Sequence, residues 1–531
     1  MTMGAMQDFE LRVMRLLDHV ARERPTREIV TRWADGHETR NSWGGIHLNS
    51  RKLAQRLEKW GIRPGDRVAS LAMNHEHHLT SWYGTMGMGG VIHTINPRLF
   101  DEQLIYIANH AEDRVLFYDK QFQPLIDRLK PLWTSIEHYV VFDDDGPEGF
   151  QALLDAEDGN YAWHEGDERE PCMICYTSGT TGNPKGVLYE HRSTVLHAMH
   201  AAEPWILGLS SRDTILPIVP MFHAAAWGLP FAGAIAACKF VFCQTNDAKM
   251  LCDAMNDEGV TLGSGVPTVW LAMFQHIDSG GEWPRSLEKI TVGGSAAPRA
   301  MLARFMDNNV KPIHLWGMTE TSPVATALAP GPEWSDLSRE HQLDIVCKQG
   351  SIPFGVELRI VDDEDNELPR DGESSGRLQI RGPWVVKRYF KAEADAAVDG
   401  WFDTGDVALL HPDGTMQITD RSKDVIKSGG EWISSVDLEN AAVGCPGVGE
   451  AAAIGVRHPK WDERPLLLVV RKPGSSVGPA EINAHLSQHV AKWWLPDEIL
   501  FVESLPHTAT GKLLKTALRE QYKDHKLATA A

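Results

Sequence analysis

Hydrophobic residues along the first part of the chain fall into two alternating patterns. Short apolar runs, which are typical of buried strands, read RVASLAM, DRVLFYD, HYVVFDD and KFVFCQ. Segments such as LTSWYGTMGMGG lie between them, and from Asp8 to Val20 the apolar residues recur at helical spacing. This alternation predicts parallel sheets covered by helices, and therefore an α/β fold.

The pattern changes after Gly355. The runs GVELRIVDD, GRLQIRG, DVALL and TMQITD are short strands separated by turn signals such as Asp413-Gly414, and they predict a small antiparallel or barrel-like layer. Beyond Asp420, helical segments at 436–442 and 480–490 mix with the strands AAAIGV and PLLLVV. We therefore expect a large N-terminal domain at 1–420 and a small α+β domain at 421–531.

Length, charge and cysteine content narrow the class of protein. A chain of 531 residues is too long for one compact core, so at least two domains are expected. With 52 basic and 72 acidic side chains and a net charge of −20, the chain is not expected to bind nucleic acid, and any anionic ligand must be met locally. Seven cysteines, an odd number, do not indicate a disulfide framework and favour a reducing compartment.

No segment has the composition of an export signal or a membrane span. The N-terminus MTMGAMQDFELRVMRLL has acidic residues where a signal peptide is basic. The most apolar run, 228–243, contains Lys239 and is shorter than the roughly 18 residues of a spanning helix. A cytoplasmic protein is expected. His75, His77 and His78 lack ligand partners at a spacing that closes a metal site, so structural or surface roles are expected for them.

The stretch YTSGTTGNPKGV, 176–187, is the first candidate for chemistry. Its small residues can bring backbone N–H groups and hydroxyls close to an oxyanion, and Lys185 adds positive charge, so it resembles a polyphosphate cradle. A flexible Gly/Ser turn is the alternative. The apolar run 172–176 before the loop, which is typical of a buried strand, and the stiffening by Pro184 favour the cradle.

Two common phosphate motifs do not fit the chain. In the nucleotide-triphosphatase loop a Ser or Thr follows the lysine, whereas Gly186 follows Lys185. The other Gly-Lys pair, Gly511-Lys512, has Pro506 in place of the first glycine, and no G-x-G-x-x-G follows a strand at the loop. The loop therefore belongs to another phosphate-handling chemistry.

Five motifs in order resemble one enzyme family over nearly the whole chain. They are the loop 176–187, WGMTETSP (316–323), GWFDTGDVA (400–408), DRSKDVIKSGGEWIS (420–434) and LPHTATGKLLK (505–515). Together they resemble the adenylate-forming superfamily of acyl-CoA synthetases, luciferases and peptide-synthetase adenylation domains. The segment INPRLFDEQLIYIANHAEDRVLFYD is similar to medium-chain fatty acyl-CoA ligases and methylmercaptopropionate-CoA ligases.

The resemblance implies a two-step reaction with ATP, CoA and a small carboxylic acid as substrates. The acid becomes an acyl-adenylate, with loss of pyrophosphate, and the CoA thiol then attacks it. Mg²⁺ is the implied cofactor, because several anionic oxygens must be brought together in the first step. A short- or medium-chain acid, such as a medium-chain fatty acid or 3-methylmercaptopropionate, is the expected substrate, and a homodimer is a further expectation.

Residue roles follow from the resemblance. Glu320 is implied as the Mg²⁺ ligand, and Thr319 contacts the α-phosphate. Asp406 and Arg421 bind the ribose. The β- and γ-phosphates are implied to be wrapped by Thr177, Ser178, Gly179, Thr180, Thr181, Gly182 and Lys185. The remaining ATP contacts, including the adenine walls, are Gly294, Ser295, Ala296, His314, Trp316, Gly317 and Met318.

The C-terminal motifs imply the parts that alternate between the two steps. Lys512 bridges the carboxylate and the α-phosphate in the family, and Lys423 matches the hinge about which the small domain rotates. A surface lysine is the alternative for Lys512. The loop brought to the acyl-adenylate in the second step comprises Lys427, Ser428, Gly429, Gly430, Glu431 and Trp432.

The acyl pocket is the least determined part of the sequence. His223 matches the family's gate between ATP and acyl pocket, and the candidate walls are Trp227, Gly293 and Trp316. The two indoles either shorten the pocket or belong to the core, and both interpretations stay open. Trp316 stands where many relatives carry Tyr, and His507 where many carry Lys.

Four other functions are alternatives to an acyl-CoA synthetase. An adenylation enzyme that loads a carrier protein, or one that oxidises the adenylate like a luciferase, has the same fold, and dependence on CoA distinguishes both. A non-catalytic acyl-adenylate sensor is disfavoured, because Lys185, Glu320, Asp406, Arg421 and Lys512 are all present. A phosphate-loop kinase is remote, since its product is ADP.

Overall fold

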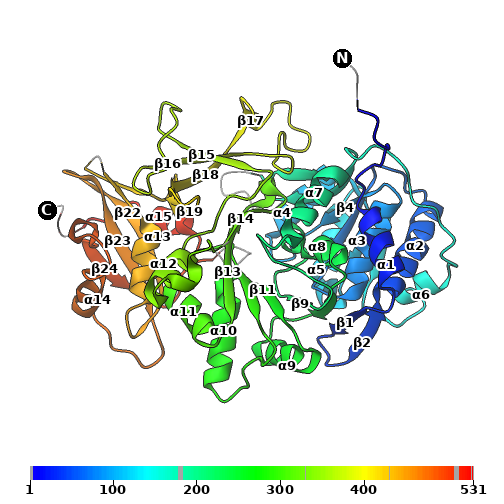
Figure 1. Ribbon diagram of the computed structural model, residues 1–531, viewed down its shortest axis with the longest axis horizontal. Coiled ribbons are helices and arrows are strands. Elements are labelled where there is room, and N and C mark those ends of the chain that lie inside the picture. Colours follow the sequence, from blue (N-terminus) through cyan, green and yellow to red (C-terminus); the bar gives the residue numbers. More distant parts are fainter. Residues whose placement is uncertain are drawn as a thin grey trace.

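The computed structural model describes residues 4–177, 183–328, 330–429, 431–507, 513–527 and 529. Figure 1 shows the sheets of the first 330 or so residues in blue to green, an antiparallel sheet in yellow above them, and the C-terminal part in orange and red to one side. None of the helices in these residues combines the length and apolar character needed to cross a bilayer.

A six-stranded sheet is built from the first strand-like runs. Its order is β6-β5-β3-β4-β7-β8, and every neighbouring pair is parallel except β7 and β8. The parallel sheet confirms the α/β expectation. The strands are β3 (Arg67–Leu71), β4 (Val91–Thr94), β5 (Asp113–Tyr118), β6 (His138–Val141), β7 (Pro171–Tyr176) and β8 (Gly186–Glu190).

An eight-stranded sheet lies beside the first, with order β14-β13-β12-β11-β9-β10-β1-β2. Its inner pairs are parallel, and the outer strands β2 and β14 run antiparallel to their neighbours. The strands are β1 (Glu28–Arg32), β2 (Glu38–Ser42), β9 (Thr214–Pro217), β10 (Lys239–Cys243), β11 (Leu262–Gly265), β12 (Lys289–Val292), β13 (Lys311–Gly317) and β14 (Val324–Ala327).

Helices cover both sheets, and one lies between them. Helix α3 contacts β3 and β4 of the first sheet and β1 of the second, so almost all of its residues are buried. The first helix begins at Met14 and not at Asp8, because the chain before it is bound to the segment 167–170 through Leu11 N and Arg12. The helices are α1 (Met14–Glu23), α2 (Trp43–Lys59), α3 (Glu76–Gly87), α4 (Asp101–Ala111), α5 (Gln123–Leu129), α6 (Phe150–Asp155), α7 (His191–Ala202), α8 (Leu229–Ile235), α9 (Ala248–Glu258), α10 (Pro267–Asp278), α11 (Arg299–Asp307) and α12 (Arg339–Cys347).

The small antiparallel layer expected after Gly355 is confirmed. It is a five-stranded sheet with order β15-β16-β18-β17, and β19 pairs with β18. Its strands are β15 (Glu357–Val361), β16 (Ser375–Arg381), β17 (Ala397–Val398), β18 (Trp401–Leu410) and β19 (Met416–Arg421). β18 and β19 bring Asp406 opposite Arg421.

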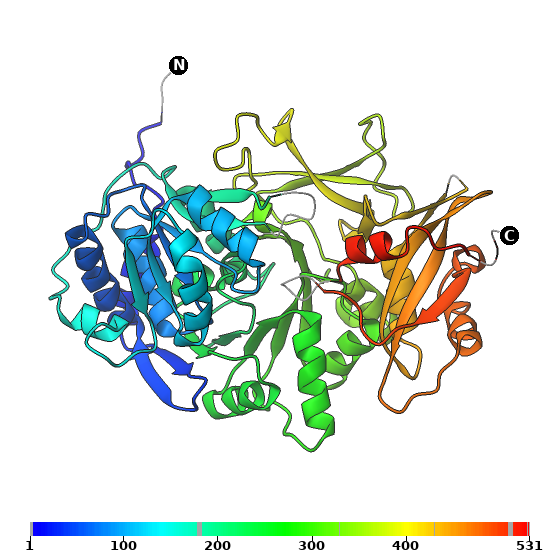
Figure 2. The same ribbon diagram turned by 180° about the vertical axis from the view of Figure 1, so that it is seen from behind.

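The residues from Ile426 onward form a smaller C-terminal domain with its own apolar clusters. In its sheet β24 runs parallel to β23, and the other pairs are antiparallel. Figure 2 shows α15 beside this sheet, and it contacts β22. The elements are β20 (Ile426–Ser428), β21 (Glu431–Ile433), α13 (Ser435–Val443), β22 (Val448–His458), β23 (Asp462–Arg471), α14 (Pro479–Leu486), β24 (Glu498–Phe501) and α15 (Lys515–Gln521).

Candidate functional site

The phosphate-loop candidate is closed by a pair of antiparallel strands. Tyr176 at the end of β7 pairs with Gly186 at the start of β8. Between them, Thr177 N donates to Lys185 O at 2.9 Å, and Lys185 N donates to Thr177 Oγ1 at 3.3 Å. These contacts form the stem of the loop. The candidates Ser178, Gly179, Thr180, Thr181 and Gly182 lie outside the described residues.

A tyrosine links this stem to the WGMTE motif. Lys185 Nζ lies 4.8 Å from the centre of the Tyr389 ring. The Tyr389 hydroxyl donates to Glu320 Oε1 at 2.9 Å. Phe390 N donates to Gly186 O at 2.8 Å, which fixes the tyrosine beside the loop. Tyr389 was not predicted as a site residue, because it lies in a segment without a chemical motif.

Glu320 is a buried carboxyl group in a cationic environment. It lies in a single 3₁₀ turn, Thr319–Thr321, and is only 7% exposed. Burial raises the pKa of Glu320, while the Tyr389 hydroxyl and the Arg421 and Lys185 cations act in the opposite direction. In this position the Glu320 carboxylate favours binding of a cation that enters the site together with a ligand.

The residues beside Glu320 are positioned by close backbone packing. The Tyr189 hydroxyl donates to Thr319 O at 2.7 Å, and Met318 N donates to Pro323 O at 3.1 Å. A Cβ on Gly317 would lie 1.9 Å from Pro323 O, so only glycine fits at the end of β13. The motif therefore folds as a tight turn that presents Thr319 and Glu320.

Asp406 is held at the junction of two sheets. Its side chain is 2% exposed; Trp316 Nε1 donates to Oδ2 at 2.9 Å, and Arg421 Nε lies 2.7 Å from Oδ1. Trp316 belongs to β13, whereas Asp406 and Arg421 are opposite each other on β18 and β19. Three predicted residues from distant motifs are thus brought together. The positive charge of Arg421 also helps to lower the pKa of Glu320, so the two clusters are neighbours.

The predicted adenine walls lie at the ends of two neighbouring strands. Gly294 and Ser295 follow β12 and are exposed. A Cβ on Gly294, whose φ is +81°, would lie 3.9 Å from the Trp227 ring, so Trp227 is close to this segment. Gly293 is buried, Ala296 is half-buried, and a Cβ on Gly293 would clash with Leu315.

His314 is turned toward a helix. It is buried in β13, and its Nδ1 lies 3.2 Å from Val346 O of α12. Burial lowers the pKa of His314 to about 4, so the ring is neutral at neutral pH. This contact fixes the strand that carries Trp316.

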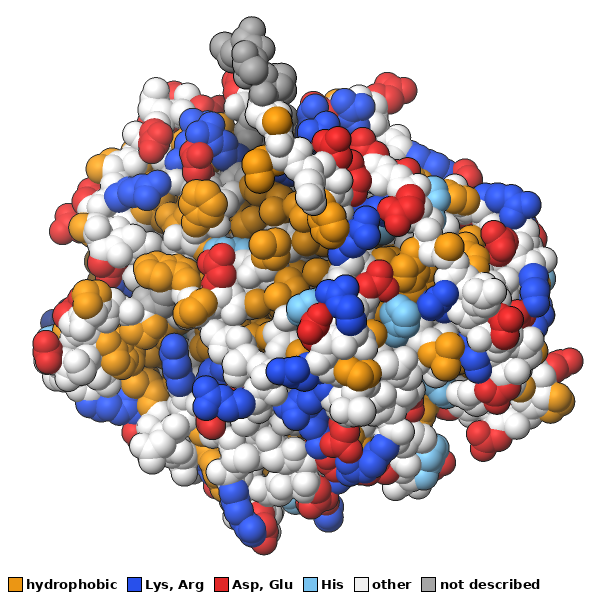
Figure 3. All heavy atoms as spheres, turned by 45° about the vertical axis from the view of Figure 1, so that its right-hand side comes forward, with side chains coloured by type: hydrophobic (Ala, Val, Ile, Leu, Met, Phe, Trp, Pro, Cys, Tyr) orange, Lys and Arg blue, Asp and Glu red, His pale blue; other side chains and the backbone are white. Residues whose placement is uncertain are grey.

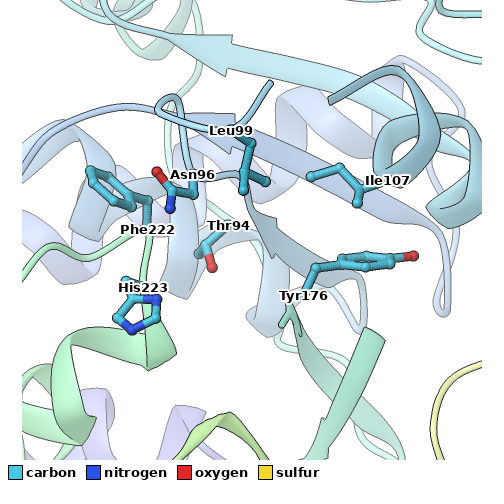
Figure 4. Close-up of a pocket in the computed structure, with 7 residues that line it drawn as sticks. All are labelled: Thr94, Asn96, Leu99, Ile107, Tyr176, Phe222 and His223. Atoms are coloured by element: carbon cyan, nitrogen blue, oxygen red, sulfur yellow. The ribbon is translucent and has the colours of Figure 1, made fainter. Parts of the chain in front are cut away.

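The predicted gate residue, His223, lines a small hollow. Figure 4 shows His223 at one side of it and Tyr176 at the other, with Thr94 between them. The rest of the lining is Asn96, Leu99, Ile107 and Phe222. Tyr176 immediately precedes the phosphate-loop stem, so the hollow that His223 lines is close to that stem.

The backbone after His223 is left-handed over consecutive residues. The φ values of Ala224, Ala225, Ala226 and Trp227 are 44°, 52°, 48° and 56°, and Gly228 follows at 75°. Non-glycine residues pay roughly 1–2 kcal/mol each for this conformation. Tertiary packing must hold the turn, which places Trp227 close to Gly294.

The C-terminal candidates are described in part. Gly429, with φ 63°, donates from its N to Trp461 O at 2.8 Å, and Arg464 donates to Ser428 Oγ at 3.2 Å. Lys427 is exposed, and burial lowers the pKa of Lys423, which follows β19. Gly430 and Lys512 lie outside the described residues, and Glu431 and Trp432 are described only as backbone of β21.

The histidines that the sequence excluded from a metal site are part of the core. His75 Nε2 lies 2.8 Å from Asp119 Oδ1, and His78 Nε2 lies 2.9 Å from Ser70 Oγ. His77 Nδ1 bonds to Phe142 O at 2.8 Å. In the described ranges, no group of three or more His, Cys, Asp or Glu side chains is placed to hold a metal ion.

Two family models match the chain. The one described as "AMP-binding enzyme" matches residues 17–390, and the one described as "AMP-binding enzyme C-terminal domain" matches residues 437–512. The 3-methylmercaptopropionyl-CoA ligase of Ruegeria lacuscaerulensis is 46% identical over 534 residues, which cover 98% of this chain and 99% of that protein. The medium-chain-fatty-acid–CoA ligase of Ectopseudomonas oleovorans is 46% identical over 534 residues, with 98% of each chain covered.

A solved structure has the same arrangement of sheets and domains. The anthranilate CoA ligase AuaEII, in complex with anthranoyl-AMP, superimposes with a TM-score of 0.86 at 24% identity, and 99% of each chain is covered. At that identity the likeness establishes the fold alone. It confirms the expected large α/β domain with a barrel-like sheet and a smaller C-terminal domain.

Proposed function

The chain belongs to the AMP-binding enzyme family and is an AMP-forming acyl-CoA ligase, and on this premise we propose that it activates a short- or medium-chain carboxylic acid. ATP and CoA are the co-substrates. Medium-chain fatty acids and 3-methylmercaptopropionate are the substrate classes, because relatives that bear these names are 46% identical over nearly the whole chain.

The observation that carries the proposed site is a pair of neighbouring clusters, one that contains Lys185 and Glu320 and one that contains Asp406 and Arg421. Lys185 contacts Tyr389, which bonds to Glu320, and Arg421 acts on Glu320 while it pairs with Asp406. These groups come from separate motifs. Cations and hydroxyls gathered around one buried carboxylate suit a nucleoside triphosphate. They neutralise the negative charge that develops on the phosphates as pyrophosphate is displaced.

In the first step we assign the phosphates to the loop and the adenosine to the strand ends. Thr177 and Lys185 lie at the stem of the loop 177–185, whose glycines and hydroxyls would receive the β- and γ-phosphates. Thr319 would contact the α-phosphate. Asp406 and Arg421 would bind the ribose. Gly294, Ser295, Ala296 and the segment 314–318 would surround the adenine.

Glu320 fits a magnesium ion that is held mainly by phosphates. Mg²⁺ usually takes one or two carboxylates and fills its remaining positions with water and substrate oxygens. The single buried carboxylate, with one oxygen bound by Tyr389, has the acceptor that such a site needs. When bound, the ion would neutralise charge on the triphosphate.

The second step needs a different arrangement of the small domain. We propose domains at 1–420 and 421–531 with a hinge near Lys423. Lys512 would bridge the carboxylate and the α-phosphate in adenylation. Rotation would then bring the loop from Lys427 to Trp432 to the acyl-adenylate, where the φ of 63° at Gly429 supports a backbone that turns sharply beside the thiol arm.

The acyl group is proposed to lie near His223 and Trp227. His223 lines the small hollow beside Tyr176, and Trp227 is close to Gly294. Trp227 and Gly293 would limit the depth of the pocket. Trp316 is bound to Asp406, which favours a role at the ribose over one at the acyl wall.

A panel of acids tests the substrate. Thioester formation is measured as kcat/KM with acetate, butyrate, hexanoate, octanoate, palmitate and 3-methylmercaptopropionate. We expect the highest value for 3-methylmercaptopropionate or for an acid of six to eight carbons, and at least about a tenfold lower value for palmitate. A maximum at palmitate would contradict the proposed pocket.

Two further properties are part of the proposal. All seven cysteines are free thiols, which supports a reducing, cytoplasmic location.

A homodimer is supported by the hydrophobic side chains gathered below the N-terminal segment in Figure 3. The chain's exposed large hydrophobic side chains include Met199 and Trp205, each about half exposed. Sedimentation of the native chain at micromolar concentration tests the dimer, and a monomer would contradict it.

A further inference from the structure

A buried cation follows closely after the segment that contains Lys512. Lys515 is the first residue of α15, and its side chain is 8% exposed. Its Nζ lies 2.7 Å from Glu439 Oε1 and donates to Ser435 Oγ at 2.6 Å. Both partners belong to α13. Removal of one partner of a buried pair is strongly destabilising, because the other charge is left uncompensated.

The same cluster is bound by a carboxylate on the other side of the proposed hinge. Asp420, in β19, is 1% exposed. Its Oδ2 accepts from Ser435 N at 2.6 Å and from Ser435 Oγ at 2.7 Å. Lys515 is the cation that faces both Asp420 and Glu439. The start of α15 is therefore fixed to α13, and α13 is fixed to the large domain in this orientation.

The described ends of the segment 508–512 are held side by side. His507 and Leu513 form an isolated antiparallel bridge, and Leu514 N donates to Pro506 O at 2.8 Å. Lys515 follows at once in the chain. The contacts of Lys515 with α13 therefore anchor the stem from which the segment containing Lys512 emerges.

We propose that Lys515 is a positioning residue for adenylation, which fixes the stem of the Lys512 segment onto α13 through Glu439 and Ser435. The inference rests on the role proposed above for Lys512. Thioester formation does not use Lys512 in that scheme, so loss of the anchor harms the first half-reaction more than the second. A purely structural role in the small domain would harm both equally.

The test measures the two half-reactions separately in Lys515→Met. Adenylation is followed as hexanoate-dependent exchange of pyrophosphate into ATP, and thioester formation as hexanoyl-CoA made from synthetic hexanoyl-adenylate and CoA. We expect exchange to fall about tenfold or more and thioester formation to change less than about twofold. Lys515→Arg keeps the charge and should restore exchange to within about threefold.

Two further variants provide matched controls. Lys523→Met removes an exposed lysine that pairs with Glu520 just beyond α15, and both half-reactions should stay within about twofold of the native rates. Glu439→Gln keeps an acceptor for Ala453 N but removes the charge beside Lys515, and exchange should again fall more than thioester formation. This variant keeps the inference testable if Lys515→Met does not fold.

The outcomes distinguish a failure of the positioning role of Lys515 from a failure of the role proposed for Lys512. Equal losses in both half-reactions, or unchanged exchange, in Lys515→Met and Glu439→Gln would overturn the positioning role. Lys512→Ala gives the reference. If this variant retains exchange, the role proposed for Lys512 fails; if it loses exchange while Lys515→Met retains it, only the positioning role fails.

Discussion

At the scale of single residues, both carboxylate oxygens of Asp406 already have partners. Trp316 Nε1 and Arg421 Nε occupy one oxygen each, so the carboxylate is oriented before the ribose that we propose as its ligand arrives. Such pre-orientation lowers the cost of binding. A tryptophan in this position donates from the ring nitrogen, which phenylalanine cannot do.

Trp316→Phe should therefore weaken ATP binding. A hydrogen bond to a charged group contributes about 1.5–3 kcal/mol, and Arg421 still holds Asp406, so we expect the KM for ATP to rise about tenfold with a smaller change in kcat. Initial rates at varied ATP measure this. Trp384→Phe is the control, because the buried Trp384 Nε1 has no hydrogen-bond partner among the described residues. Equal effects in the two variants would contradict the account.

Tyr389→Phe tests the charge state of Glu320. The hydroxyl favours the ionised carboxylate, so its removal raises the pKa of Glu320 further, in the same direction as burial. If ionised Glu320 is needed for adenylation, the acid limb of the kcat/KM profile moves to higher pH by about one pH unit. The phenyl ring remains beside Lys185 as an internal control. An unmoved acid limb would exclude Glu320 as the group that titrates.

At the scale of elements, the sequence predicted some strands of every sheet but not the turn that follows His223. β3, β5, β6 and β10 were predictable, because strands of a covered parallel sheet are continuous apolar runs. The left-handed turn at 224–227 was not, since Ala-Ala-Ala-Trp favours a right-handed helix. Only tertiary packing selects that turn. The ring of His197 beneath Gly228 is one such contact, because a Cβ on Gly228 would lie 2.6 Å from it.

Ala226→Gly should lower the free energy of unfolding only slightly, although Ala226 is buried. Ala226 and Ala232 are both 0% exposed, but Ala232 lies in the right-handed helix α8. Ala232→Gly should cost about 2 kcal/mol through lost helix propensity and a lost buried methyl group. At Ala226, relief of the left-handed conformation offsets this loss, and the cost should be less than about 1 kcal/mol. Urea unfolding followed by tryptophan fluorescence measures both, and equal costs would refute the strained turn.

At the scale of the whole molecule, buried neutral histidines make the fold sensitive to acid. Burial lowers the pKa of His78, His191 and His197 to about 3 in each case. The unfolded chain binds protons on these rings near pH 6.5, whereas the folded chain does not. Stability is therefore full above about pH 7 and falls as the pH drops from there toward 3.

His197→Gln should make this dependence shallower. His197 Nε2 accepts from Val324 N at 3.0 Å, and a glutamine oxygen offers an acceptor there without a titrating ring. Between pH 7 and pH 5 the native chain should lose about 2 kcal/mol more of unfolding free energy than the variant. Urea unfolding at both pH values measures the difference. If the native chain and the variant lose the same unfolding free energy between pH 7 and pH 5, His197 is protonated in the folded state.

The candidate site was predictable where it consists of motifs and not where it depends on tertiary contact. Lys185, Glu320 and Asp406 lie in motifs that the family resemblance names. The structure joins Lys185 to Glu320 through Tyr389, and it pairs Asp406 with Arg421. Tyr389 joins two of these motifs through contacts that only the folded chain creates. The role of Lys512 stays a prediction.

The central claim is that the reaction passes through an acyl-adenylate before the thioester. Rapid quench of excess enzyme with ATP labelled at the α-phosphate, hexanoate and no CoA tests it most directly. The account predicts a labelled, enzyme-bound hexanoyl-adenylate and free pyrophosphate, and then conversion of the label to AMP with formation of hexanoyl-CoA when CoA is added. Labelled ADP, or a thioester formed without a preceding adenylate, would contradict it.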